Sequence, residues 1–200
     1  IERRGQAARL YMEGMRRVEK LLLIVDSSSD ITKELEQEFG VRVVNIHISM
    51  DGREIEDREE LDIDRFLAEL DGMDPLPCTS QVTALEFFAA FSRAADEGYN
   101  RLICCTLNAQ GSGTYEAALN GGRLLFAERP ELQGKVKIDC VDGMTYSMGY
   151  GWQVLKAARL AQQGASGDQV LAFLRKALAD QASYVGVYSL KFPKKSGRLT

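Results

Sequence analysis

The 200-residue sequence lacks several features that would point to particular classes of protein. It has a single histidine, His47, and four scattered cysteines without a C-x-x-C pair, so we expect no metal site. No apolar run approaches the roughly 20 residues of a membrane-spanning helix, and the longest, residues 21–25, has the length of a strand. Residues 1–20 are basic and contain no apolar segment typical of a signal peptide. With the cysteines interpreted as reduced thiols, these absences predict a cytoplasmic protein without a transmembrane segment.

The overall composition excludes two further classes. A hydrophobic fraction of 45% is too high for a disordered chain. The chain has 25 basic and 29 acidic residues, a net charge of −4, which argues against a general nucleic-acid binder. Residues 51–74 are strongly acidic, and we expect a solvated surface there, with a docking surface for a basic partner as the alternative.

Segments with strand composition alternate with segments of helical period along the chain. This alternation predicts parallel βαβ units and an α/β fold with a mostly parallel sheet and helices on both of its faces. Residues 50–54 indicate a tight turn or hairpin. We expect strands at 21–25, 41–48, 101–106, 135–141 and 183–190, and helices from residue 31 and at 63–70, 84–97, 112–127, 147–162 and 168–179.

Four loops rich in serine, threonine and glycine are the candidates for chemistry. In an open parallel sheet, ligands bind outside the carboxyl ends of the strands, so these loops should meet at one edge. They are residues 26–30, 77–81, 107–113 and 142–147.

The loop around Gly111 and Gly113 follows a predicted strand and opens a predicted helix. Its exposed N–H groups and the helix dipole could hold an anionic oxygen, although Ser112 could also be a plain helix cap. The loop is not a Walker A motif, because no Gly-Lys-Ser/Thr follows, and it lacks the third glycine of a dinucleotide fingerprint.

Two loops contain residues with capping potential. Thr83 and Glu86 match a capping box, which leaves the upstream hydroxyls of Thr79 and Ser80 free to donate to a carboxylate or to form a local turn. The segment from Asp26 to Asp30 could bind a metal or a hydroxyl, but we favour the interpretation of Asp30 as the N-cap of the following helix.

The remaining features favour packing over catalysis. Gly149 and Gly151 lie inside a predicted helix, where glycine is unfavourable, and this suggests close approach of a backbone or a ligand, or tight helix packing. We expect His47 to be a packed, hydrogen-bonded side chain, and without a G-x-S-x-G elbow serine chemistry is poorly supported.

Taken together, the loops resemble the DegV family of bacterial fatty-acid-binding proteins. The resemblance covers residues 20–200 and rests on five motifs in the family's order, including its Asp-Ser-(Ser/Thr)-Ser-Asp turn and its Thr-Ser-Gln signature. The matching segments are 23–30, 79–81, 112–115, Asp142 with 147–151, and 194–199.

The resemblance implies a lipid-binding carrier that is not an enzyme. In such a protein a long-chain fatty acid such as palmitate, stearate or oleate lies between two lobes, and no other cofactor is needed. The acid is presented to the catalytic subunit of a fatty acid kinase, with transient membrane contact allowed. The family's paired serines correspond here to Asn108 and Ala109. By this resemblance the lipid-binding residues are Thr79, Ser80, Asn108, Ala109 and Ser112, with Arg198 as a countercharge.

The resemblance also divides the chain. Residues 1–19 are interpreted as a leader or appended segment, residues 20–145 as the DegV-like α/β domain, and residues 146–200 as the incomplete beginning of a second α/β lobe.

The alternative function, from a different class, is a transferase that binds phosphate or another small anion in the loop from Gly111 to Gly113.

Overall fold

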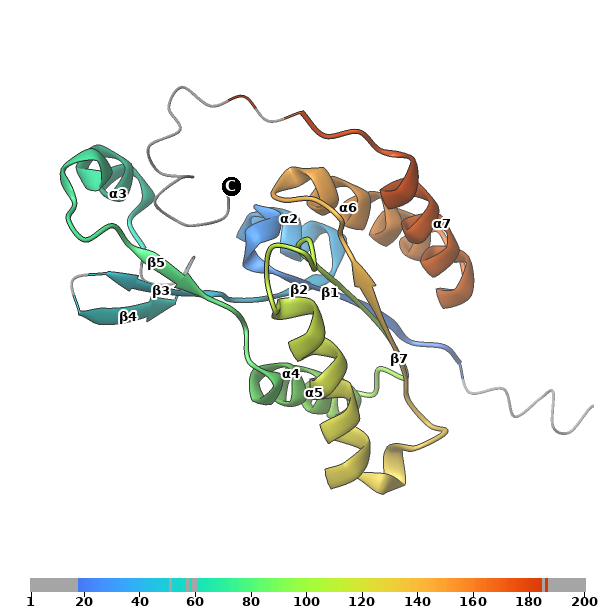
Figure 1. Ribbon diagram of the computed structural model, residues 1–200. Helices are drawn as coiled ribbons and strands as arrows, with labels where there is room; N and C mark the ends of the chain where they lie inside the picture. Colours follow the sequence, from blue (N-terminus) through green and yellow to red (C-terminus); the bar gives the residue numbers. More distant parts are fainter. Residues whose placement is uncertain (1–17, 51, 57, 59–60, 185, 187–200) are drawn as a thin grey trace, which may run out of the picture.

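The computed structural model describes residues 18–50, 52–56, 58, 61–184 and 186. Its centre is a four-stranded parallel sheet with the order β2-β1-β6-β7 (Figure 1). β1 and β6 are built from Leu, Ile, Val and Cys side chains and are almost entirely buried, as expected for inner strands covered on both faces. These strands are β1 (Leu21–Asp26), β2 (Val41–Val44), β6 (Arg101–Thr106) and β7 (Lys137–Asp142).

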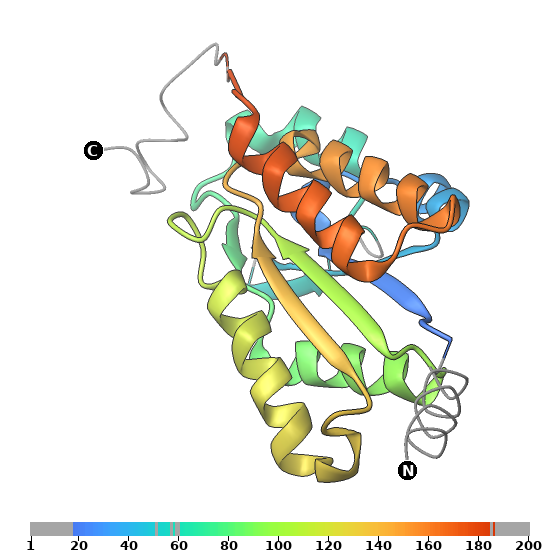
Figure 2. The same cartoon turned by 90° about the vertical axis from the view of Figure 1, so that its right-hand side faces the viewer.

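Helices cover both faces of this sheet (Figure 2). Because side chains alternate along a strand, Leu23 and Val25 of β1 pack with α2, α6 and α7, whereas Leu22 and Ile24 pack with α4 and α5. The α/β fold class is therefore confirmed. The helices are α2 (Lys33–Phe39), α4 (Ala84–Asp96), α5 (Thr114–Glu128), α6 (Met148–Gln162) and α7 (Gly167–Asp180), with 3₁₀ turns at Ser27–Ser29, Leu70–Gly72 and Pro130–Leu132.

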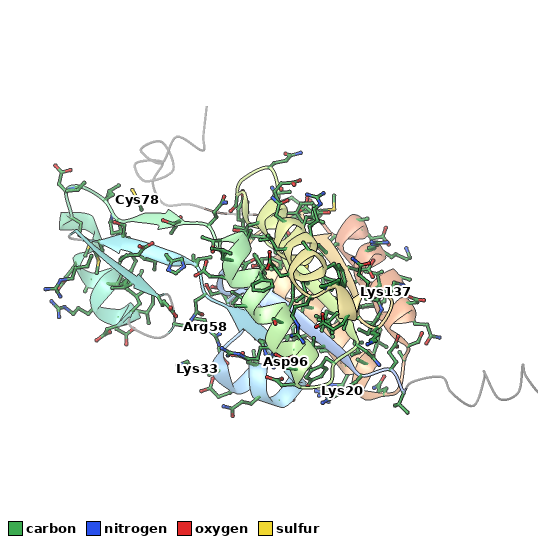
Figure 3. The ribbon with its side chains drawn as sticks, turned by 90° about the horizontal axis from the view of Figure 1, so that it is seen from below. Lys20, Lys33, Arg58, Cys78, Asp96 and Lys137 are labelled. Atoms are coloured by element: carbon green, nitrogen blue, oxygen red, sulfur yellow. The ribbon has the colours of Figure 1, made fainter. Side chains whose placement is uncertain are left out.

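A second sheet, antiparallel and of three strands in the order β4-β3-β5, projects from the parallel sheet together with α3 (Figures 1 and 3). The turn expected at residues 50–54 is confirmed as the β3–β4 hairpin, and Cys78, labelled in Figure 3, begins β5. Its elements are β3 (His47–Met50), β4 (Arg53–Glu56), α3 (Ile63–Glu69) and β5 (Cys78–Ser80).

The predicted single strand at 41–48 is wrong, because the chain changes sheets within it. Val44 pairs with Asp26, the last residue of β1, so parallel pairing ends there. From His47 onward the chain pairs with β4 and β5 instead. Residues 78–80, predicted as loop, are the third strand of that sheet.

Helix capping follows the sequence at one site and departs from it at another. The capping box of Thr83 and Glu86 is confirmed at the start of α4. Asp30 does not cap α2: its backbone is left-handed, with φ 55°, and the N-cap is Thr32, whose Oγ1 accepts from the N–H of Leu35 at 3.3 Å. The helix begins at residue 33, so Asp30 lies too far upstream to reach its first turn.

Gly151 of α6 allows close contact with another backbone, as one of the sequence interpretations expected. A Cβ atom at Gly151 would lie 2.3 Å from the carbonyl oxygen of Ser29, so α6 touches the turn after β1. This helix comes from the segment assigned to a second lobe, and that assignment stays a prediction.

Parts of three predicted segments lie outside the described residues. These are residues 1–17 of the expected leader, residue 185 and residues 187–190 of the expected strand at 183–190, and residues 191–200 of the expected second lobe, which include the motif at 194–199. Ser183, Tyr184 and Gly186 belong to no regular element. Among the helices in the described part of the chain, none has the length and apolar character needed to cross a membrane.

Candidate functional site

All four candidate loops contribute to one small pocket of about 210 Å³, which we call the loop pocket. Three of the loops follow β1, β6 and β7 at their carboxyl ends, and the fourth leads from β5 into α4. The convergence expected at this edge of the sheet is therefore found. The lining residues are Ser28, Ile46, Thr79, Ser80, Gln81, Leu107, Gly111, Ser112, Thr114 and Tyr146.

A fully buried carboxylate, Asp26, holds the loop after β1 against the loop after β6. It accepts hydrogen bonds from the N–H of Leu107 at 2.8 Å, the N–H of Ser28 at 3.0 Å and the hydroxyl of Tyr150 at 2.7 Å. Burial raises the pKa of Asp26 and outweighs these three hydrogen bonds, which lower it. Burial, with the adjacent carboxylate, also raises the pKa of Tyr150, so its hydroxyl keeps its proton and donates to Asp26.

A second carboxylate, Asp142, joins the loop after β7 to the loop after β6. Its Oδ1 accepts from the N–H of Ala109 at 3.0 Å and from that of Met144 at 2.9 Å. The carbonyl of Thr145 accepts from the N–H of Asn108 at 3.0 Å. The two loops are thus fixed to each other by one bond to the Asp142 side chain and one bond between backbone groups.

Most N–H groups of the expected anion site already have partners. The N–H of Ala109 donates to Asp142, while those of Gln110 and Gly111 donate to the side chain and the carbonyl of Asn108, each at 3.0 Å. Within the part of the chain that the structure describes, only the N–H groups of Ser112 and Gly113 in this turn have no partner. Asn108 and Ala109 do not line the pocket, and their role toward a ligand stays a prediction.

The hydroxyls of Thr79 and Ser80 are available for a ligand. Both residues are exposed in β5, opposite Ile48 and His47 of β3, rather than in a local turn. Neither hydroxyl bonds to another described residue.

Ser112 also lines the pocket, but its hydroxyl is partly used. Its Oγ accepts from the N–H of Thr114 at 3.2 Å and lies 2.9 Å from Oγ1 of Thr114, while Gly113 is the N-cap of α5.

Two pocket residues, Gln81 and Tyr146, were not among the predicted site residues. A Cβ atom at Gly113 would lie 2.0 Å from Oε1 of Gln81, and one at Gly111 would lie 1.9 Å from the hydroxyl oxygen of Tyr146. The glycines therefore leave room for side chains from the neighbouring loops. The available signals were the position of Gln81 after Thr79 and Ser80, and an aromatic residue within a loop of small ones.

The single histidine is packed and hydrogen-bonded, as the sequence predicts. Nε2 of His47 lies 2.5 Å from Oε1 of Glu86, which also completes the capping box with Thr83. Burial raises the pKa of Glu86, but hydrogen bonds from Thr83 and His47 outweigh it and the net direction is downward. Among the described residues, no group of three or more His, Cys, Asp or Glu could hold a metal ion, and all four cysteines are free.

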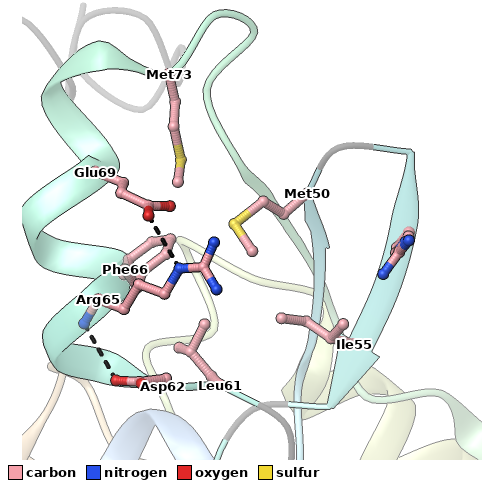
Figure 4. A pocket seen from close by; sticks show the side chains of 9 residues that line it. Met50, Ile55, Leu61, Asp62, Arg65, Phe66, Glu69 and Met73 are labelled. Carbon is pink, nitrogen blue, oxygen red and sulfur yellow. Dashed lines mark hydrogen bonds and ion pairs between the residues drawn. The ribbon is translucent and has the colours of Figure 1, made fainter.

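A larger pocket of about 500 Å³ lies between the β3–β4 hairpin and α3 (Figure 4). It shares no lining residue with the loop pocket. Nε of Arg65 pairs with Glu69, one turn further along α3, at 2.9 Å, so the charges in the lining are partly neutralised by each other. Its apolar lining consists of Met50, Ile55, Leu61, Phe66 and Met73.

Comparison with known sequences identifies relatives of this chain. The family model described as "Uncharacterised protein, DegV family" matches residues 20–200, which include Arg198, a residue outside the described part. A DegV domain-containing protein of Clostridium perfringens is 32% identical over 179 residues, covering 88% of this chain and 60% of that protein. Another, from Caldanaerobacter subterraneus subsp. tengcongensis, is 27% identical over 183 residues, covering 92% and 62%. The chain thus spans about 60% of the length of these relatives.

Solved structures show the same fold. A DegV family protein from Thermus thermophilus, described by its fatty acid binding, superposes with a TM-score of 0.77 at 27% identity, covering 90% of this chain and 61% of that one. A DegV family protein from Ruminococcus gnavus superposes with a TM-score of 0.79 at 22% identity, covering 92% and 63%. The resemblance seen in the five motifs is confirmed, and the chain belongs to the DegV family.

Proposed function

We propose that this protein binds a long-chain fatty acid, such as palmitate, stearate or oleate, with the carboxylate in the loop pocket. The observation that carries the proposal is the convergence of four loops on a pocket whose polar side chains are hydroxyls and one amide. The fatty-acid-binding relative from Thermus thermophilus, at 27% identity, supports the same ligand class.

The size of the loop pocket suits a head group rather than a whole ligand. Pockets that enclose a ligand usually measure roughly 300–1,000 Å³, and this one measures about 210 Å³. The tail therefore extends beyond it, past the apolar wall formed by Ile46 and Leu107. Burial of the tail contributes about 0.8 kcal/mol per CH₂ group, so the polar residues need only orient the carboxylate.

The head-group contacts we propose come from two loops. Thr79 and Ser80 donate from hydroxyls that have no other partner among the described residues. Ser112 adds its N–H group and its hydroxyl, whose oxygen already accepts from the N–H of Thr114. Asn108, Ala109 and Arg198 remain proposed contributors.

We propose a carrier role, in which the bound acid is presented to the catalytic subunit of a kinase in the cytoplasm. Among the described residues that line the loop pocket there is no histidine, lysine, arginine or acidic residue, which favours holding a ligand over acid–base catalysis. The division into residues 20–145 and the beginning of a second lobe at 146–200 belongs to the same proposal.

The test is direct binding to the purified chain. Native mass spectrometry should detect a co-purified fatty acid, and the delipidated protein should bind oleate in a titration. Thr79→Val, which keeps a β-branched side chain on β5, should weaken binding about tenfold, since a hydrogen bond to a charged group is worth roughly 1.5–3 kcal/mol. Ser49→Ala, at an exposed position of the adjacent strand β3, should leave the affinity unchanged. A wild-type chain that binds no fatty acid would refute the proposal.

The second candidate is a transferase that binds phosphate or another small anion at Gly111–Gly113. The free N–H groups of Ser112 and Gly113 at the start of α5 are the observation in its favour. A thermal-shift panel of nucleotides and phosphorylated metabolites separates the two candidates. Stabilisation by these compounds but not by oleate would favour the transferase.

A further inference from the structure

Tyr146 is a pocket residue for which the structure shows no internal role. Its side chain is 45% exposed, yet it lines the loop pocket beside Ser112 and Thr79. Its hydroxyl forms no hydrogen bond with any residue in the described part of the chain. A hydroxyl held at a pocket wall without a partner is available to a ligand.

The backbone that carries Tyr146 is fixed on both sides. Before it, the carbonyl of Thr145 accepts from Asn108. After it, the hydroxyl of Ser147 donates to the carboxylate of Asp30, and the carbonyl of Tyr146 itself accepts from the N–H of Gly149 at 3.1 Å. The backbone at Tyr146 is therefore ordered before a ligand binds, and only the side-chain torsions remain to be fixed on binding.

Gly111 provides the space that this hydroxyl occupies. A Cβ atom at residue 111 would lie 1.9 Å from the hydroxyl oxygen and 3.0 Å from Cζ of Tyr146. Any side chain there would displace the phenol from the turn that carries Ser112.

We propose that Tyr146 is a head-group ligand, whose phenolic hydroxyl donates a hydrogen bond to the carboxylate of the bound acid. This inference rests on the proposed fatty-acid binding and adds a donor from the loop after β7 to those from β5 and from the loop after β6. Hydrogen bonds to an ionised acceptor are roughly twice as strong as neutral ones, so this contact favours the acid over its uncharged esters.

The test compares Tyr146→Phe with the wild-type 200-residue chain, after delipidation, in titrations with oleate and with methyl oleate. The titrations are run at about pH 8, where the carboxylate of oleate is ionised. We expect Tyr146→Phe to bind oleate about tenfold more weakly and methyl oleate with a smaller change. Tyr115→Phe is the matched control, because Tyr115 does not line the pocket and its hydroxyl bonds to no described residue.

The outcomes separate this inference from the proposed function. If the wild-type chain does not bind oleate, the proposed function fails. The role of Tyr146 fails and the proposed function stands if the wild-type chain binds oleate and Tyr146→Phe binds it equally well. The same holds if the substitution weakens the binding of oleate and of methyl oleate to the same extent. Gly111→Ala gives an independent check: it should weaken oleate binding, and adding it to Tyr146→Phe should weaken binding no further. Additive losses would contradict the inference.

Discussion

Replacement of Tyr150 by phenylalanine tests whether the buried carboxylate holds the loops together. Tyr150 is fully buried in α6, and its hydroxyl donates to Asp26 at 2.7 Å. Phenylalanine keeps the ring and removes one of three donors to a carboxylate that has no contact with solvent.

The expected loss of stability is about 2 kcal/mol at about pH 8. A hydrogen bond to a charged group is worth roughly 1.5–3 kcal/mol, and the two backbone donors from Ser28 and Leu107 remain. For a chain of this size, 1 kcal/mol shifts the melting temperature by about 2–4 °C, so we expect a decrease of about 4–8 °C.

The loss should also depend on pH, with a sign set by the raised pKa of Asp26. Burial raises this pKa above its ordinary value of 3.8, so the contribution of Asp26 to stability is fully present below that value and decreases as the pH rises through the folded-state pKa. Without the Tyr150 hydroxyl the folded-state pKa of Asp26 rises further, and the decrease in stability with rising pH becomes larger. The destabilisation by Tyr150→Phe should therefore shrink to about 1 kcal/mol, that of a neutral hydrogen bond, once Asp26 is protonated.

Urea denaturation at a series of pH values measures this difference. Tyr115→Phe serves as the control, since its hydroxyl bonds to no described residue, and it should change the free energy of unfolding by less than about 0.5 kcal/mol. If Tyr150→Phe matches this control, or if its effect grows toward acid pH, the hydrogen bond to Asp26 does not stabilise the fold as argued.

Two pairs of substitutions test the packing of the helices and the opposite end of the sheet. Gly121→Ala should destabilise the protein by about 1–3 kcal/mol, because its Cβ would lie 3.0 Å from backbone atoms of α4. Gly122→Ala, whose nearest neighbour is 3.9 Å away, should instead stabilise it by up to about 1 kcal/mol, and equal effects at both positions in thermal melts would contradict the close contact. Arg101→Met should lower the free energy of unfolding by about 3 kcal/mol, since the buried guanidinium pairs with Asp139 at 2.5 Å. Arg175→Met removes an exposed partner of the Asp139 carboxylate and should change the free energy of unfolding by less than about 1 kcal/mol. Similar losses of stability in the two variants would argue against the buried pair of Arg101 and Asp139.

The parallel sheet could be predicted because its signals are local. The composition of residues 21–25 and of residues 101–106 is in itself typical of a buried strand. Each segment is followed by turn residues and then by a segment with helical periodicity. The capping box at Thr83 was likewise visible, because both of its partners lie within four residues of each other.

The antiparallel sheet could not be predicted in full, because its pairing is not local. β3 and β5 are separated by about thirty residues, and β5 has only three exposed residues, so it lacks an apolar pattern. The continuous β-branched composition of residues 41–48 also concealed the point where the chain leaves one sheet for the other.

The candidate site was predictable at the level of loops rather than of individual atoms. Hydroxyl-rich composition identified the loops with Thr79 and Ser112, which do line the pocket. The sequence could not show that the N–H of Ala109 is already bound, nor that Tyr146 lies over Gly111, since both depend on contacts between loops more than thirty residues apart.

The order of the strands explains why the loop after β6 is held so firmly. β6 lies between β1 and β7, although the chain order places β1 far from both. Each of these two neighbours ends in an aspartate, Asp26 in β1 and Asp142 in β7. Each carboxylate accepts a hydrogen bond from an N–H group of the loop after β6, that of Leu107 and that of Ala109 respectively. Neither carboxylate lines the loop pocket, so neither is placed to meet a ligand there. They set the path of the turn that carries Ser112, so the acidic residues of the motifs shape the pocket without placing a carboxylate among its described lining residues, where it would repel an anionic head group.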